Sequence, residues 1–129
     1  MSAPDLTVVV CTHNRAAYLP ACLDSLLRQD LPRDRFEIIV VDNASTDNTA
    51  EVCRTCENRG VRRIFDAVPG LSHARNTGWR AGGGEWIAFL DDDAIACAGW
   101  LSAAWAGCCS LQPAPAGLGG PVRLQWDTP

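Results

Sequence analysis

Short apolar runs alternate along the chain with stretches in which apolar residues recur every three or four positions. Four runs are rich in β-branched or aromatic residues and have the length of buried strands: Leu6–Thr12, Phe36–Val41, Val61–Phe65 and Glu85–Leu90. The stretches between them have the spacing of one apolar helix face. This alternation predicts an α/β fold, with a mostly parallel sheet, right-handed crossovers and helices on both faces.

Capping and breaking residues bound four expected helices. One ends near Gln29 ahead of Pro32, one ends before Gly60, one opens at Ser72, and the last carries Leu101, Ala104, Trp105 and Cys108 on one face. The third carries a face of small residues: Ala74, Gly78 and Ala81.

From residue 110 onward the periodic pattern gives way to Pro and Gly. Val122–Trp126 has the composition of one more strand, and no helix follows it before Pro129. We expect residues 1–129 to form one domain that lacks a C-terminal half and represents the front of a longer protein.

Composition narrows the class of protein. The chain has 129 residues, 47% hydrophobic and 20% charged, which suits one folded domain and excludes a disordered chain. No apolar run approaches the ~20 residues of a membrane span, and the N-terminus lacks the basic region of a signal peptide. We expect a cytoplasmic protein, with the inner face of the membrane as a further location for the full-length protein. The net charge of −4 argues against a nucleic-acid partner.

All 11 basic residues are Arg, which excludes lysine-dependent phosphate loops and Schiff-base chemistry. Seven cysteines, an odd number without a signal peptide, indicate reduced thiols rather than disulfides. Cys53 and Cys56 have the spacing of a zinc or redox motif, but no second pair completes it. Their helical spacing with Thr49 and Val52 favours core positions.

Polar clusters follow three of the expected strands. Thr12–Arg15 follows the first strand, Asp42 and Asn43 follow the second, and Asp91–Asp93 follows the fourth. Ligands bind beyond the carboxyl ends of parallel strands. The three clusters therefore predict one binding site at that edge of the sheet.

The three adjacent carboxylates indicate a metal site. In extended backbone Asp91 and Asp93 point to the same side, with Cα atoms about 6.5–7 Å apart. Two carboxylates in this arrangement suit a hard divalent cation. The alternative is an acidic turn in which Asp93 caps the following segment.

The other clusters suit a nucleotide. Asp42 and Asn43 stand where such sheets accept hydrogen bonds from ribose or base, although the residues after them also serve to cap a helix. The His13 ring can stack on a base, and Arg15 can pair with phosphate. Arg75 lies near a helix start where an anion would bind, or is a solvated surface residue. Trp100 is typical of a packing residue, although it follows the aspartates closely enough to touch a sugar ring.

Taken in order, four motifs resemble the nucleotide-sugar-binding half of family 2 glycosyltransferases, which have the Rossmann-like GT-A fold. The matching stretches, within about residues 6–110, are Val8–Arg15, Val40–Asp47, Gly70–Gly78 and Gly84–Asp93. The resemblance implies a glycosyltransferase that binds a nucleoside diphosphate sugar and transfers the sugar with inversion to a glycan, lipid or small-molecule acceptor.

The resemblance also implies residue roles. Asp93, with Asp91, would ligate Mg²⁺ or Mn²⁺ bridging the diphosphate. The residues implied in binding the donor are Thr12, His13, Arg15, Asp42, Asn43, Arg75, Asn76, Asp91 and Asp92. Family members are longer and supply the general base from their second half, so no catalytic residue is assigned here, and Asp127 lies too near the end to nominate. We expect this chain alone to bind a nucleotide weakly and to catalyse poorly.

Three other classes are compatible with parts of this pattern. A phospho-receiver domain requires an acidic pair after the first strand and a Lys after the last, and both are missing. A sugar nucleotidyltransferase requires a Gly-rich basic loop, whereas Cys11–Arg15 contains no Gly. A non-catalytic nucleotide-binding module stays open as the alternative.

Overall fold

The computed structural model describes residues 2–124 and shows strands and helices in alternation. The strands are β1 (Leu6–Thr12), β2 (Phe36–Asn43), β3 (Val61–Asp66) and β4 (Trp86–Phe89). The α-helices are α1 (Leu19–Leu27), α2 (Thr49–Arg54), α3 (Leu71–Ala81) and α4 (Trp100–Ser110), and two 3-10 turns are η1 (Arg33–Arg35) and η2 (Glu57–Arg59). The strands form one parallel sheet in the order β3-β2-β1-β4.

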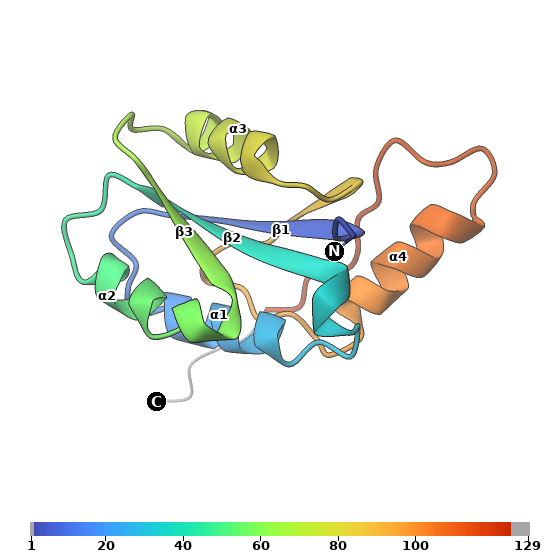
Figure 1. Cartoon of the computed structure of the whole chain (residues 1–129), viewed down its shortest axis with the longest axis horizontal. Helices are drawn as coiled ribbons and strands as arrows, with labels where there is room; N and C mark the ends of the chain where they lie inside the picture. Colours follow the sequence, from blue (N-terminus) through green and yellow to red (C-terminus); the bar gives the residue numbers. More distant parts are fainter. Residues whose placement is uncertain (1, 125–129) are drawn as a thin grey trace.

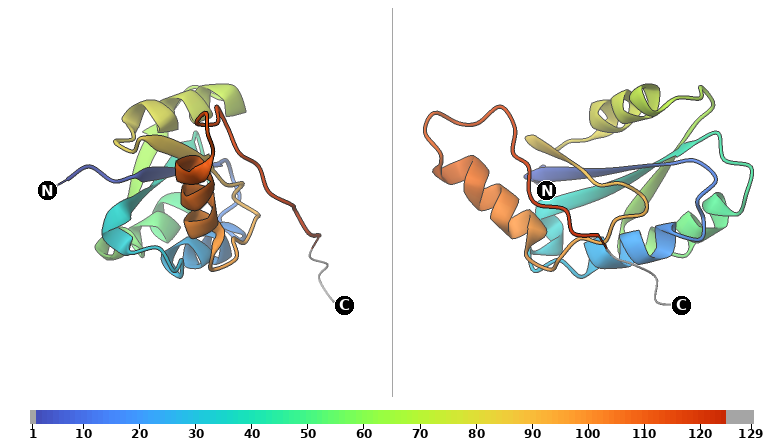
Figure 2. Two further views of the ribbon diagram at one scale, coloured as in Figure 1. Left: turned by 90° about the vertical axis from the view of Figure 1, so that its right-hand side faces the viewer. Right: turned by 180° about the vertical axis from the view of Figure 1, so that it is seen from behind.

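Helices cover both faces of this sheet, which confirms the expected architecture. In Figure 1, α3 lies on one face, and α1 and α2 lie on the other. The helix α4 lies beside the amino-terminal end of the sheet, as the view from behind in Figure 2 also shows. The carboxyl ends of the strands, with the loops into α1, α2 and α3, therefore share the opposite edge.

The central strands are buried because successive side chains point to opposite faces of the sheet, and helices cover each face. Val8 and Val10 of β1 belong to the core that contains α1, whereas Val9 packs with Ala74 of α3. All three β1 valines are at most 1% exposed. The expected core positions Thr49 and Cys53 of α2 are also fully buried, which agrees with a structural role for that cysteine.

The small residues of α3 bring this helix close to the sheet. A Cβ atom added to Gly78 would lie 2.3 Å from Cγ1 of Val9 and 3.1 Å from Cγ2 of Val41. After α3, Gly84 approaches β1 so closely that a Cβ would lie 2.5 Å from the Thr7 nitrogen. Glycine at this position therefore lets the connection between α3 and β4 lie against β1.

Several element boundaries differ from those expected. The second helix ends at Arg54 and continues only as the turn η2, which Gly60 closes in the left-handed region with φ 87°. The strand β4 ends at Phe89, although Leu90 still donates a backbone hydrogen bond to Val9. Residues 122–124 contain no strand, and the rest of the strand expected over Val122–Trp126 lies outside the described residues. None of the helices found between residues 2 and 124 is long and apolar enough to cross a membrane.

Replacing Gly78 with Ala is expected to lower the free energy of unfolding by about 1–3 kcal/mol, because the added methyl overpacks the interface with Val9. The loss should exceed the gain of about 1 kcal/mol in helix propensity. Urea denaturation followed by circular dichroism measures it. The control is Gly119→Ala, where an added Cβ meets nothing within 4 Å. Equal stability of both variants would show that α3 is packed more loosely.

Candidate functional site

The carboxyl ends of β1, β2 and β4 converge on one groove of about 480 Å³, a volume typical of small-molecule sites. It lies between the loop after β1 and the aspartates after β4, with α3 on one side. The lining residues are Cys11, Thr12, His13, Arg15, Asn43, Leu71, Ala74, Asp91, Asp92 and Asp93. Segments that are some 80 residues apart in sequence thus form a single site.

The loops after β1 and β2 are fastened to each other. Asn14 adopts the left-handed region with φ 51°, and its Oδ1 accepts hydrogen bonds from the Thr46 nitrogen at 2.7 Å and the Asp47 nitrogen at 3.2 Å. In return, Oδ2 of Asp47 accepts a hydrogen bond from the Ala16 nitrogen at 3.1 Å. Because both loops are held in this way, the backbone of Thr12–Arg15 is fixed beside the groove.

The aspartate triplet lies in a turn rather than in extended backbone. The Ala94 nitrogen donates a hydrogen bond to the Asp91 carbonyl at 3.0 Å, which bends the chain directly after the last ladder bond of β4. The expectation that Asp91 and Asp93 share one side of an extended strand is therefore wrong. The turn leaves both of them exposed and directs Asp92 into the protein.

Asp92 is the buried member of the triplet, with only 7% of its surface exposed. The Thr12 hydroxyl donates a hydrogen bond to its Oδ2 at 2.9 Å. Burial raises the pKa of Asp92, and the hydrogen bond from Thr12 and the charge of Arg15 offset part of this rise. Asp92 thus joins the ends of β1 and β4.

Arg15 links the loop after β1 to the aspartates after β4. Its Nη1 lies 3.1 Å from Oδ2 of Asp93 and 3.6 Å from Oδ1 of Asp92. Within residues 2–124, no hydrogen bond or ion pair engages the side chain of Asp91. No three His, Cys, Asp or Glu residues in this part of the chain form a ready-made metal site.

Asp42 does not line the groove. It is 1% exposed, and its Oδ2 accepts two hydrogen bonds from Arg63, at 3.0 Å from Nε and 2.8 Å from Nη2. Its Oδ1 accepts a hydrogen bond from the Ser45 nitrogen at 3.2 Å. Both carboxylate oxygens are therefore engaged within the protein, and Asp42 supports the loop that leads into α2.

Asn43 lines the groove and fixes the loop between β3 and α3. Its Nδ2 donates to the Val68 carbonyl at 2.7 Å, and its Oδ1 accepts from the Gly70 nitrogen at 3.0 Å. The Asn43 carbonyl lies 2.6 Å from Nδ1 of His13, which must carry the proton to donate to it. This contact orients the exposed His13 ring and leaves Nε2 on its other side.

A polar cluster between the end of β3 and α3 was not assigned a role from the sequence. Oδ2 of the buried Asp66 lies 2.7 Å from Nδ1 of His73 and accepts a hydrogen bond from the Thr77 hydroxyl at 2.9 Å. Burial acts to raise the pKa of Asp66, but the hydrogen bonds from Val68, His73 and Thr77 outweigh it and lower this pKa. The sequence did contain a signal for this cluster. Asp66 directly follows an expected strand, and His73 and Thr77 lie one helical turn apart in the helix that comes next.

Besides Asp42, three residues named from the sequence lie outside the lining of the groove. The Arg75 guanidinium lies over the Phe89 ring, 5.9 Å from its centroid. Asn76 is exposed and accepts a hydrogen bond from the Trp79 indole at 3.0 Å. Trp100 packs against the apolar core.

The groove also has an apolar part, which the sequence reasoning missed. Cys11, Leu71 and Ala74 line it, and burial raises the pKa of the Cys11 thiol to about 11. Their positions in the sequence could have indicated this role, since Cys11 directly precedes Thr12 and the other two residues lie in the first turn of α3.

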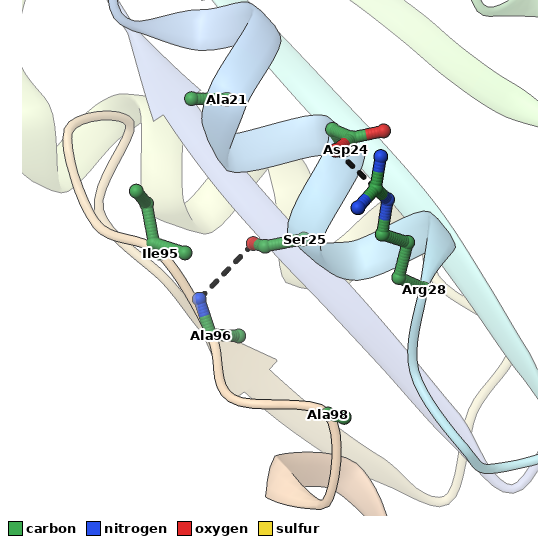
Figure 3. Close-up of a pocket in the computed structure, with 7 residues that line it drawn as sticks. All are labelled: Ala21, Asp24, Ser25, Arg28, Ile95, Ala96 and Ala98. Atoms are coloured by element: carbon green, nitrogen blue, oxygen red, sulfur yellow. Dashed lines mark hydrogen bonds and ion pairs between the residues drawn. The ribbon is translucent and has the colours of Figure 1, made fainter.

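A second hollow, of about 290 Å³, lies between α1 and the segment that follows the aspartates (Figure 3). Within it, the Ala96 nitrogen donates a hydrogen bond to the Ser25 hydroxyl at 3.0 Å. Arg28 pairs with Asp24 at 3.0 Å along the helix. None of the site residues named from the sequence lines this hollow. The hydrogen bond of Ser25 holds the chain just beyond the triplet.

Comparison with known proteins identifies the family. The family model described as "Glycosyl transferase family 2" matches residues 7–108. The chain belongs to this family. It is 36% identical to a validoxylamine A glucosyltransferase of Streptomyces hygroscopicus subsp. jinggangensis over 119 residues, which is 90% of this chain and 28% of the relative. It is 40% identical to a PGL/p-HBAD biosynthesis glycosyltransferase of Mycobacterium bovis over 72% of this chain and 37% of the relative.

Solved structures of glycosyltransferases have the same fold. TarS of S. aureus, residues 1–349, matches with a TM-score of 0.75 and 30% identity, over 79% of this chain and 31% of that chain. The mannosyltransferase PcManGT of Pyrobaculum calidifontis matches with a TM-score of 0.67 and 35% identity, over 74% of this chain and 29% of that chain. The family 2 chain thus spans about a third of the length of these proteins.

Replacing Asp66 with Asn is expected to destabilise the protein at pH 7, because the native state holds the pKa of this carboxyl below its usual range. The native carboxylate then contributes stability above the ordinary Asp pKa of about 3.9, and this contribution is lost as the pH falls through and below that value. The difference in unfolding free energy between the two proteins should therefore shrink from pH 7 to pH 3. Urea denaturation measures it.

The control is Asp34→Asn, which removes an exposed carboxylate in η1 and is expected to change stability little at pH 7. A difference between wild type and the Asp66 variant that grows on acidification would contradict the lowered pKa.

Proposed function

We propose that this chain forms the donor-binding part of a glycosyltransferase that transfers a sugar from a nucleoside diphosphate sugar with the help of Mg²⁺ or Mn²⁺. The observation that carries the proposal is the groove in which Asp91–Asp93 face Thr12–Arg15 at the carboxyl edge of the sheet. Inverting transfer, the mode implied by the resemblance to the family, is part of the proposal.

The structural relatives support the ligand class. TarS has been solved in complex with UDP and with UDP-GlcNAc, and PcManGT with GDP-Man and Mn²⁺. These ligands share a ribonucleoside diphosphate and differ in base and sugar. We therefore assign the class of nucleoside diphosphate sugars to the groove of this chain.

Asp91 and Asp93 would hold the metal ion. Both are exposed carboxylates on the groove, and hard divalent cations prefer oxygen ligands. Since residues 2–124 contain no three-ligand site, the remaining coordination positions would be filled by diphosphate oxygens and water. When bound, the ion would act as a Lewis acid that stabilises the negative charge of the leaving diphosphate.

The protein's own side chains would bind and orient the donor. Arg15 is the cation on the groove and suits the diphosphate, while the His13 ring, oriented by the Asn43 carbonyl, suits the flat face of the base. Asp92 would keep Thr12 in place. The role of Asp42 is to fix, through Ser45, the loop beside the groove, so we propose that its effect on base and ribose is indirect.

Arg75 and Asn76 would contribute at the rim of the donor site through the first turns of α3. The general base and the acceptor site, whether for a glycan, a lipid or a small molecule, are assigned to the part of the longer relatives that the match does not cover. A cytoplasmic location stays a prediction.

The metal role predicts that binding of UDP or GDP to this chain is tighter in Mn²⁺ than in EDTA, and that Asp93→Ala removes most of the difference. We expect the variant to lose about tenfold or more in affinity in Mn²⁺, equivalent to about 1.4 kcal/mol. Isothermal titration calorimetry measures both constants. The matched control is Asp34→Ala, which removes an exposed carboxylate at the amino end of β2.

Two outcomes would contradict the proposal. Equal affinities of wild type and the Asp93 variant in Mn²⁺ would remove the metal role from this residue. A wild-type chain that binds neither nucleotide in Mn²⁺ would argue against a donor site in this groove.

A further inference from the structure

The guanidinium of Arg15 lies beside the carboxylates of the triplet. The triplet places three carboxylates side by side, and two of them, Asp92 and Asp93, have Nη1 of Arg15 within 3.6 Å and 3.1 Å. Among the residues that the structure describes, no other Arg lies within ion-pair distance of the triplet. Arg15 is thus the cation that neutralises these carboxylates in the ligand-free protein.

The backbone around Arg15 is fixed, so that the side chain is the part able to move. The Arg15 carbonyl accepts two backbone hydrogen bonds of the turn that leads into α1, from Tyr18 at 3.0 Å and Leu19 at 3.2 Å. The flanking residues Asn14 and Ala16 are fastened to the loop after β2. The side chain itself is half exposed, and its guanidinium lies only 5.8 Å from the centroid of the Tyr18 ring on the solvent side.

A metal ion and Arg15 compete for the same carboxylate. The ion proposed above would bind Asp93, whose Oδ2 is the atom that Arg15 contacts at 3.1 Å. A divalent cation at this place repels a guanidinium that remains a few ångströms away. The ion alone must therefore displace Arg15 from Asp93 and leave it only the longer contact to Asp92.

A diphosphate removes this penalty. Guanidinium groups bind phosphate oxygens through two parallel hydrogen bonds, so Arg15 finds a new partner as soon as a diphosphate enters the groove. The ion, in turn, finds the oxygen ligands that the protein lacks, because residues 2–124 offer no three-ligand site. Metal and diphosphate then each favour the binding of the other.

We propose that Arg15 is an exchangeable counter-ion, which pairs with Asp92 and Asp93 before donor binding and transfers to the diphosphate when the metal takes Asp93. This inference rests on the proposed function, because it needs a metal and a diphosphate in the groove. Its consequence is a site that disfavours the bare ion and the bare nucleotide and selects their complex.

The test compares Mn²⁺ binding by wild type, Arg15→Gln and Arg15→Lys without nucleotide, using the electron paramagnetic resonance signal of free Mn²⁺. Arg15→Gln is expected to bind Mn²⁺ about three- to tenfold tighter, since the competing charge is gone. Arg15→Lys retains the charge and should bind Mn²⁺ as weakly as wild type. The control Arg28→Gln makes the same change in net charge away from the groove, on an Arg paired with Asp24, and should leave Mn²⁺ binding unchanged.

The second measurement is UDP affinity by calorimetry. Arg15→Gln should weaken UDP binding about tenfold in saturating Mn²⁺ but much less in EDTA, because in wild type Arg15 is available to the diphosphate only once the metal has replaced it. Circular dichroism confirms that each variant is folded.

The outcomes separate this inference from the proposed function. If Asp93→Ala loses metal-dependent UDP binding but Arg15→Gln binds Mn²⁺ no tighter than wild type, the counter-ion role is wrong and the donor site stands. If Arg28→Gln gains as much Mn²⁺ affinity as Arg15→Gln, the effect is one of net charge and the counter-ion role is again wrong. If Asp93→Ala changes nothing, the metal site and the inference fail together.

Discussion

Parallel pairing of four strands with both faces covered by helices is the constraint on which the rest of the molecule depends. Val8 and Val10 on one face of β1 and Val9 on the other are all buried, so a polar side chain in the middle of the strand would lose its hydration without gaining a partner. Polar chemistry is therefore confined to the strand ends. Since all four strands run the same way, their carboxyl ends bring Thr12, Asn43 and Asp92 to one edge.

This constraint explains why the sequence was informative about the fold. Buried parallel strands are continuous apolar runs, and the polar residues directly after them mark the site, so the groove between the loop after β1 and the triplet could be predicted. The small face of α3 was readable for a similar reason, since only a residue without a side chain fits where Gly78 meets Val9. The ends of the elements were less predictable, because Gly60 and η2 depend on how α2 meets β3.

Side-chain roles within the site depended on partners that are distant in sequence. Asp42 and Asn43 are neighbours with similar chemistry, yet one is bound by Arg63, 21 residues away, and the other lines the groove. Adjacent strand residues point to opposite faces of the sheet, but it is the pairing of β3 with β2 that brings Arg63 to the face on which Asp42 lies. The turn at Asp91 is a comparable case, since three aspartates in a row give no sign of whether the chain stays extended or turns after the strand.

The charges of the groove raise a physical question, because an acidic protein with three carboxylates at its site is proposed to bind an anion. The chain carries a net charge of −4, and Asp91 and Asp93 are exposed where a diphosphate would approach. Alone, they would repel it. A divalent cation reverses the sign of this side of the groove, and Arg15, released from Asp93, adds a second positive charge. An anionic ligand would therefore bind beside the acidic triplet more favourably when a cation arrives with it, and under the proposed function the metal would contribute to donor recognition as well as to the departure of the diphosphate.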